Sequence, residues 1–210
     1  MLETRTGNTL SSKSSEAANL YQKAVDLILG SETGAAETLD KALELDKNFA
    51  LAAAARYYVA QDVGEPGANT YKQLAERTSL DASDWEREHI NVLIGLIDEA
   101  GATQARALAY IETTPTDLLI VAKLSGNMFF YDGPKKLETV LSVFESDEHA
   151  SGDDWAFLSR LGFAASEAGP RKRVLTLIER ALVIRPRSLY HLHGLAHLLH
   201  HVGTPEEPAK

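Results

Sequence analysis

Glycines at nearly even spacing are the feature that most restricts the fold of this chain. Six of them follow segments in which apolar residues recur at helical spacing, namely Gly30, Gly64, Gly101, Gly133, Gly169 and Gly203. The intervals between them are 34, 37, 32, 36 and 34 residues. Glycine is favoured just beyond a helix C-terminus because it adopts positive φ without a Cβ clash. The spacing therefore predicts a corner between helices at each glycine, with positive φ at Gly64, Gly133 and Gly169.

Polar or proline breaks recur at twice this interval. Lys47, Pro115 and Pro186 lie 68 and 71 residues apart, and each separates the end of one helical segment from the start of the next. A helix–turn–helix unit of about 34 residues is typical of tetratricopeptide-type repeats, whose units stack to bury their apolar faces. The sequence predicts an all-α, right-handed, tetratricopeptide-like solenoid of about five and a half helical hairpins, without a β-sheet.

The expected helices alternate between two sets, A and B. The A helices are predicted over residues 15–29, 48–63, 83–99, 116–132, 153–168 and 187–202. The B helices are predicted over residues 35–45, 67–79, 102–113, 134–146 and 171–184. Ser83 and Glu86 have the spacing of a capping box at the start of the third A helix. We expect one repeat domain over residues 15–203, a mobile polar arm over 1–14 and a short tail over 204–210.

Three stretches resemble the tetratricopeptide repeat protein 38 family. They are "WEREHINVL", "TPTDLLIVAKLSGNMFFYDG" and "RPRSLYHLHGLAHLLHHVG". The first carries a Glu-x-x-His arrangement at Glu86 and His89, and the third matches a His-x-x-Ala-His pattern at His193 and His197. The resemblance extends over about residues 15–204. It implies a helical-repeat fold and implies no particular reaction.

Charge and composition exclude several classes of function. The chain has 30 acidic and 21 basic residues and a formal net charge of −9, so a phosphate backbone is repelled and nucleic acid is not an expected partner. It has no cysteine, which excludes disulfides, thiolate metal sites and a cysteine nucleophile. No apolar run reaches the roughly 18 residues of a membrane span, and the first residues are polar, so we expect a cytoplasmic protein.

Five of the seven histidines lie between His191 and His201. On a helical wheel, one face carries His193, His197, His200 and His201, together with Tyr190 and Gly194. The opposite face, which we expect to pack on the preceding repeat, carries Leu192, Leu195, Leu199 and Val202. Two interpretations stay open. The histidines form an ordinary solvated face, or His193, His197 and His201 hold a divalent metal such as Zn²⁺, because imidazoles at i and i+4 can share one ion.

A groove lined by the A helices would bring further residues to these histidines. The candidate catalytic residues are His193, His197, His89 and Glu86, although Glu86 has helix capping as its alternative role. The groove is expected to be lined by Asn127, Tyr131, Trp155 and Tyr190. Phe129 and Phe130 are expected in the core.

Two functions are compatible with these patterns. The first is a scaffold that binds a peptide or partner protein through the concave groove. The alternative is a small-molecule enzyme or metal-binding protein that uses the cluster of His89, His193, His197 and His201. In either case an uncovered apolar stripe is expected on the last helix, at Leu195, Leu198 and Val202. Such patches mark association surfaces, so we expect a homodimer through that helix.

Overall fold

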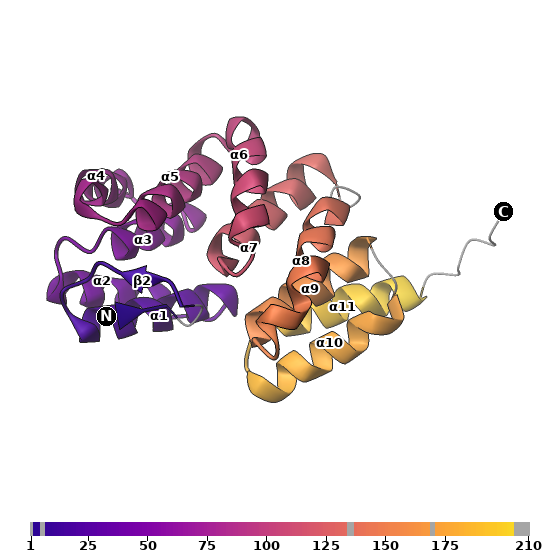
Figure 1. Cartoon of the computed structure of the whole chain (residues 1–210). Coiled ribbons are helices and arrows are strands. Elements are labelled where there is room, and N and C mark those ends of the chain that lie inside the picture. The colour runs from indigo at the N-terminus through magenta and orange to yellow at the C-terminus, as the bar shows by residue number, and fades with distance from the viewer. Residues whose placement is uncertain (1, 5–6, 134–136, 169–170, 204–210) are drawn as a thin grey trace. The chain divides into compact units, whose positions relative to one another are not determined.

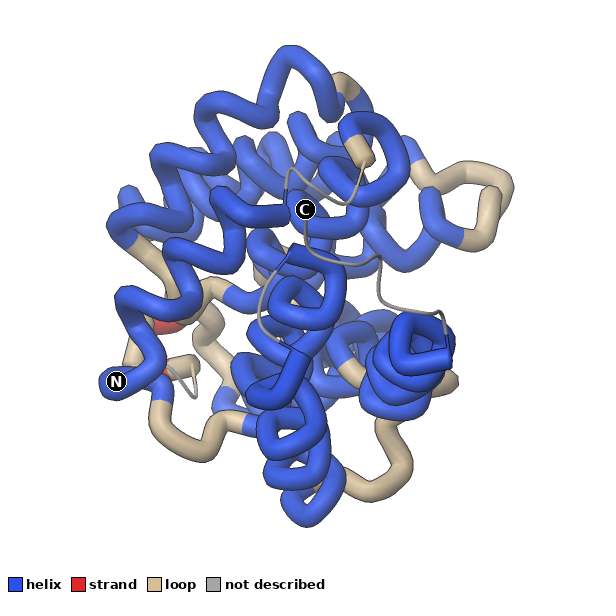
Figure 2. The backbone as a smooth tube through the Cα atoms, turned by 90° about the vertical axis from the view of Figure 1, so that its right-hand side faces the viewer, coloured by secondary structure: helices blue, strands red, loops and turns tan. Residues whose placement is uncertain are grey.

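The structure is a computed structural model of the chain, and it describes residues 2–4, 7–133, 137–168 and 171–203. Helices form most of this described chain (Figure 2), which confirms the all-α prediction. Contacts between residues divide the chain into two compact units, Met1–Asn127 and Met128–Lys210. None of the described helices is both long enough and apolar enough to cross a membrane.

The first unit begins with two short strands and continues with seven α-helices (Figure 1). Its elements are β1 (Leu2–Glu3), β2 (Thr9–Leu10), α1 (Ser15–Leu29), α2 (Ala35–Leu45), α3 (Ala50–Asp62), α4 (Asn69–Thr78), the 3₁₀ turn η1 (Ser79–Asp81), α5 (Asp84–Asp98), α6 (Ala100–Thr113) and α7 (Leu118–Asn127). The second unit contains the π-helical turn η2 (Met128–Asp132), α8 (Leu137–Ser151), α9 (Trp155–Ala168), α10 (Arg171–Ile184) and α11 (Leu189–Gly203).

The helices follow the predicted alternation closely. Every predicted A or B helix has a counterpart in the described chain. One A helix differs from the prediction. The segment predicted over 116–132 is an α-helix only as far as Asn127, and the π-helical turn η2 follows it. Single π-helical turns of this type are frequent at functional sites.

The N-terminal segment contains structure that the sequence did not predict. β1 and β2 pair antiparallel, with Leu2 opposite Leu10 and Glu3 opposite Thr9, so the expectation of no β-sheet is wrong for this short hairpin. Leu10 is buried at 4% exposure, and the Gln22 amide of α1 donates to the Glu3 carbonyl at 3.0 Å. This hydrogen bond ties the backbone of the hairpin to the first helix.

The prediction of positive φ at the glycines between helices is confirmed in part. Gly64 and Gly133 have φ of 65° and 88°, as predicted, whereas Gly169 lies outside the described residues.

Gly30 has φ of −82°, and the next residue, Ser31, takes the left-handed conformation at 52°. A Cβ on Gly30 would lie 3.2 Å from the Asp26 carbonyl oxygen, so a close backbone approach explains this glycine. Gly101 lies inside α6 and marks no corner.

The A helices of the first unit contact one another in sequence order, and α7 also contacts α1. The centre of this set is α3, in which Ala50 to Ala55 are all buried. Alanine on every side lets several helices approach the same helix, and α3 contacts α1, α2, α4 and α5. Stacked solenoid repeats contact only their neighbours. The α1–α7 contact therefore joins the first and fourth A helices in a way that simple stacking does not predict.

In the second unit, α9 contacts α8, α10 and α11. Two glycines allow close packing around Ile178 of α10. A Cβ on Gly162 of α9 would lie 3.1 Å from Ile178 Cγ1, and a Cβ on Gly194 of α11 would lie 3.4 Å from Ile178 Cδ1. Gly194 is therefore on the buried face of α11, although the sequence placed it on the histidine face.

Candidate functional site

Glu86 is a structural residue at the start of α5. Its carboxylate completes the predicted capping box, because it accepts from the Ser83 backbone N–H at 3.0 Å while Ser83 Oγ accepts from the Glu86 N–H at 3.2 Å. The other carboxylate oxygen accepts from the backbone N–H of Ser11 at 2.8 Å. Glu86 is fully buried, and these bonds tie the residues after β2 to the start of α5. The capping role is confirmed, and catalysis by Glu86 stays a prediction.

One turn later, His89 pairs with a carboxylate that the sequence analysis did not single out. His89 Nδ1 lies 2.6 Å from Asp117 Oδ2, and the Tyr110 hydroxyl donates to the same oxygen at 2.6 Å. Their exposures are 2% for His89 and 7% for Asp117. An ionised carboxylate only accepts hydrogen bonds, so Nδ1 carries the hydrogen and, in the neutral ring, Nε2 is the acceptor.

Two polar ring atoms near this pair have no hydrogen-bond partner within the described chain. They are His89 Nε2 and Trp85 Nε1, both buried. Trp85 precedes His89 by one helical turn, and their ring centroids are 5.7 Å apart. The Trp85 N–H lies near the Tyr110 oxygen without reaching hydrogen-bond geometry, and it only partly offsets the burial that raises the pKa of that phenol.

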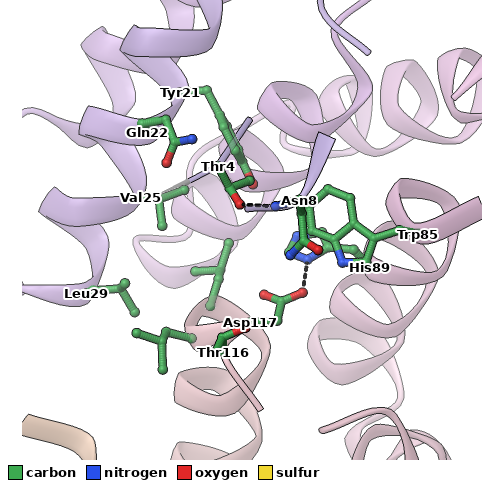
Figure 3. Close-up of a pocket in the computed structure, with 12 residues that line it drawn as sticks. Thr4, Asn8, Tyr21, Gln22, Val25, Leu29, Trp85, His89, Thr116 and Asp117 are labelled. Atoms are coloured by element: carbon green, nitrogen blue, oxygen red, sulfur yellow. Dashed lines mark hydrogen bonds and ion pairs between the residues drawn. The ribbon is translucent and has the colours of Figure 1, made fainter. Parts of the chain in front are cut away.

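Both rings line a small cavity of about 40 Å³. Figure 3 shows Trp85 and His89 on one side of it and side chains of α1 on the other. The lining residues come from the hairpin (Thr4, Asn8), from α1 (Tyr21, Gln22, Val25, Leu29), from α5 (Trp85, His89) and from the start of α7 (Thr116, Asp117, Leu118, Leu119). The hairpin, α1, α5 and the start of α7 therefore form this cavity together.

Tyr21, which lines the cavity, and Tyr110, which bonds to Asp117, both have a raised pKa. Burial raises the pKa of the Tyr21 phenol well above its ordinary value, and the charges of Asp117 and Glu86 raise it further. Burial likewise raises the pKa of Tyr110, with the Asp117 charge as the second cause. Burial is thus the main cause of both shifts, and the negative charge of Asp117 adds to it.

A second cavity in the first unit, of about 310 Å³, is lined by polar and charged residues. These are Ser11, Lys13, Asp46, Asn48, Arg77, Thr78 and Asp81. Asp46 already accepts from Ser12 Oγ and from the backbone N–H groups of Lys13 and Asn48. Its carboxylate therefore holds the chain around residues 12–14 against the α2–α3 corner.

The second unit holds a cluster of aromatic and histidine rings, called here the aromatic–histidine surface. His193 and His197 are neighbours, with ring centroids 4.5 Å apart. Phe163 of α9 contacts both of them, at 5.9 Å and 5.3 Å, and Phe129 of η2 lies 6.0 Å from His197. Ring contacts join Phe129, Phe130, Phe163, Tyr190, His193 and His197, from η2, α9 and α11, with Phe163 buried beneath the others. The surface also includes Tyr131, which follows Phe130 in η2.

Two residues of this surface project strongly into solvent. Phe130 is 81% exposed and Tyr131 is 79% exposed, so the expectation of Phe130 in the core is wrong. The π-helical turn is the physical reason, because it changes the rotation per residue and directs both side chains outward. Tyr190 lies under the Arg160 guanidinium, 3.4 Å from its ring centroid, and burial raises the pKa of its phenol.

Other predicted site residues have structural roles. Asn127 Nδ2 donates to the Leu96 carbonyl at 2.8 Å and so ties the end of α7 to α5. Trp155, expected in the groove, is only 7% exposed and packs edge-on against His191, with ring centroids 5.6 Å apart.

The buried face of α11 differs from the prediction. His191 and Gly194 are buried, whereas Leu192 and Leu199, expected to pack on the preceding repeat, are 50% and 61% exposed. Close packing of Gly194 on Ile178 sets this rotation of the helix. The side chains of Leu198, His200, His201 and Val202 lie outside the described residues.

The predicted metal site is thus only partly within the described chain. Its described side chains include no group of three histidine, aspartate or glutamate residues able to hold a metal ion. His193 and His197 lie together, and the third expected ligand, His201, is not described. His89 belongs to the first unit and this pair to the second, so a groove shared by all three stays a prediction.

No known protein family, curated protein or solved structure matches this chain. The resemblance to the tetratricopeptide repeat protein 38 family therefore stays a hypothesis that rests on the three stretches alone.

Proposed function

We propose that this chain is a helical-repeat interaction module, acting in the cytoplasm, and that its aromatic–histidine surface binds a peptide segment of a partner protein. The observation that carries the proposal is the exposure of Phe130 and Tyr131 beside further rings. Large aromatic side chains are costly to leave in water and are enriched at the centres of protein interfaces. The rings come from η2, which is the end of the fourth predicted A helix, and from α9 and α11, which are the fifth and sixth. In a tetratricopeptide-like repeat these A helices would line the groove.

The tetratricopeptide-like, right-handed order of the hairpins belongs to the same proposal. Alternation of A and B helices along the described chain supports it. The α1–α7 contact indicates that the first four A helices curve more tightly than stacked repeats usually do.

A peptide library displayed on phage tests the proposal, with the full chain as the immobilised target. We expect enriched peptides whose affinity falls at least about tenfold in a Phe130→Ala/Tyr131→Ala variant, because interface aromatics dominate binding energy. Val63→Ala is the matched control, since Val63 is 71% exposed but lies in the first unit. Peptides that bind the double variant as tightly as the unchanged chain would contradict the proposal.

A second candidate function is metal binding, which the close pair of His193 and His197 favours. Two imidazoles one turn apart supply half of a tetrahedral Zn²⁺ site. Titration of Zn²⁺ into metal-free protein should show saturable binding that His197→Ala abolishes. Leu192→Ala, on the same helix, should bind normally. A His201→Ala variant then tests the third predicted ligand, and equal binding by His197→Ala and the unchanged chain would exclude the site.

A homodimer through α11 is part of the proposal as well. The exposed side chains Leu189, Leu192 and Leu199 lie along one side of this helix at 56%, 50% and 61% exposure. A second copy of the chain would cover them by a two-fold contact. Light scattering at micromolar concentration should give a dimer that Leu192→Glu converts to monomer, while Val63→Glu does not. A monomer for the unchanged chain would contradict this part.

A further inference from the structure

The cavity between α1, α5 and α7 is a site that the proposed interaction function does not use. We propose that it binds a small neutral hydroxyl group on a short aliphatic stem, either a free alcohol or the end of a longer molecule. The carrying observation is that Trp85 and His89 both line one cavity, and that their buried ring nitrogens, the donor Trp85 Nε1 and His89 Nε2, have no partner in the described chain.

The His89 acceptor is fixed by its surroundings. Asp117 accepts the Nδ1 hydrogen at 2.6 Å, and Tyr110 holds the same carboxylate oxygen in place. When the ring is neutral with its hydrogen on Nδ1, the second nitrogen is an acceptor. Leaving a buried polar atom unpaired is costly, so a ligand that pairs it gains that energy on binding.

A hydroxyl group can satisfy both atoms at once. Its O–H donates to His89 Nε2, while its oxygen accepts from Trp85 Nε1. An ammonium group has no lone pair for the Trp85 N–H, and an ether or a nitrile has no hydrogen for His89. The two unpartnered atoms, Trp85 Nε1 and His89 Nε2, therefore favour a ligand group that both donates and accepts a hydrogen bond.

The charge and the volume of the cavity restrict the class of ligand further. The described residues that line the cavity include Asp117 and no lysine or arginine, so a buried anion would be repelled and unpaired. Its walls also include Val25, Leu29, Leu118 and Leu119, which suit methyl and methylene groups. A volume of about 40 Å³ accommodates about three water-sized groups, at roughly 10–15 Å³ each. Ethanol has this size and chemistry.

Ethanol titration of the full chain, followed by the ¹⁵N and ¹H signals of the histidine rings, tests the site. We expect a saturable shift at His89 Nε2, with a Kd on the order of 1 mM or weaker, since so few ligand atoms make contact. His191 is the internal control, because it is equally buried but lies in the other unit. Acetonitrile has the same number of non-hydrogen atoms and no donor, and should cause no saturable shift.

Matched variants separate binding from folding. Trp85→Phe removes the donor and should weaken ethanol binding about five- to tenfold. Val25→Leu keeps both polar atoms, His89 Nε2 and Trp85 Nε1, but fills the cavity, so it should abolish the ethanol-dependent shift of the His89 signal. Val63→Leu, on the surface, should leave that shift unchanged. Circular dichroism checks that each variant is folded.

Two results would overturn the proposal. One is a His89 shift that rises linearly with ethanol or is matched by acetonitrile, and the other is full binding in Val25→Leu. Longer alcohols distinguish the two sources of the hydroxyl group. Affinity that falls from ethanol to 1-hexanol indicates a closed site for a free small alcohol, and affinity that rises indicates a site for the end of a longer molecule.

Discussion

His89 on α5 and Asp117 at the start of α7 form a buried pair, with Nδ1 and Oδ2 at 2.6 Å. The two residues are 28 positions apart, and the Tyr110 hydroxyl joins them through the same oxygen. This network fixes the His89 tautomer and links three helical segments of the first unit.

Asp117→Asn should destabilise the chain by about 1.5–3 kcal/mol, the usual contribution of a buried hydrogen bond to a charged group. The amide keeps the size of the carboxylate but accepts more weakly from His89 and Tyr110. Urea unfolding measures the change. The same experiment on Asp84→Asn, an exposed carboxylate of α5, should give almost none. Equal effects of the two changes would show that the buried network is unimportant.

His191 should make stability depend on pH in the second unit. Burial lowers its pKa below the ordinary value of 6.5, and the positive charges of Arg160 and Arg185 lower it further. In the unfolded chain His191 therefore binds a proton near pH 6.5, whereas in the folded chain it binds that proton only at lower pH. The free energy of unfolding should fall as pH decreases through this window, and level off once the folded state also binds the proton.

His191→Phe removes this titration while keeping an aromatic ring against Trp155. The stability difference between the two proteins, measured from pH 7.5 to 5 in urea, should shift in favour of the variant as pH falls. Other titrating groups cancel in this difference. A difference that is constant with pH would contradict the assignment to His191.

Arg56→Lys should be destabilising although it preserves the charge. Arg56 is buried on α3, donates from Nη1 and Nη2 to the two oxygens of Glu65 at 2.8 Å each, and donates from Nε to Asp40 at 2.8 Å. Lysine cannot reproduce this planar fork or the stacking on Tyr71. We expect a loss of about 1–2 kcal/mol in thermal or urea unfolding. Arg77→Lys, an exposed position, serves as the control and should be neutral.

Two glycine-to-alanine changes should have opposite signs. Gly162→Ala places a methyl group 3.1 Å from Ile178 Cγ1, and Ile178 cannot retreat because Gly194 packs against it from α11. Such overpacking costs about 1–3 kcal/mol. A Cβ on Gly126 in α7 would meet no atom within 4 Å, so Gly126→Ala should gain about 0.5–1 kcal/mol of helix stability. A stabilising Gly162→Ala would show that the α9–α10 contact is looser than described.

The features that the sequence determined by itself are local. Helix positions, the Ser83–Glu86 capping box and the corners at Gly64 and Gly133 depend on hydrogen bonds and φ preferences within a few residues. Apolar periodicity reports these directly, which is why the helix order could be predicted. The tendency of histidines to gather near the C-terminus was equally visible, but not which of them would be buried.

Tertiary packing decided the rest. Asp117 looked like an ordinary helix-start residue before "LLIV", and only the approach of α5 to α7 made it the partner of His89. The rotation of α11 depended on Gly194 fitting against Ile178, which buried His191 and exposed Leu192. A helical wheel gives the angles between side chains on one helix but not the angle at which a neighbour packs. That angle is set by the shapes of residues distant in sequence, and it therefore appears only when the helices pack against one another.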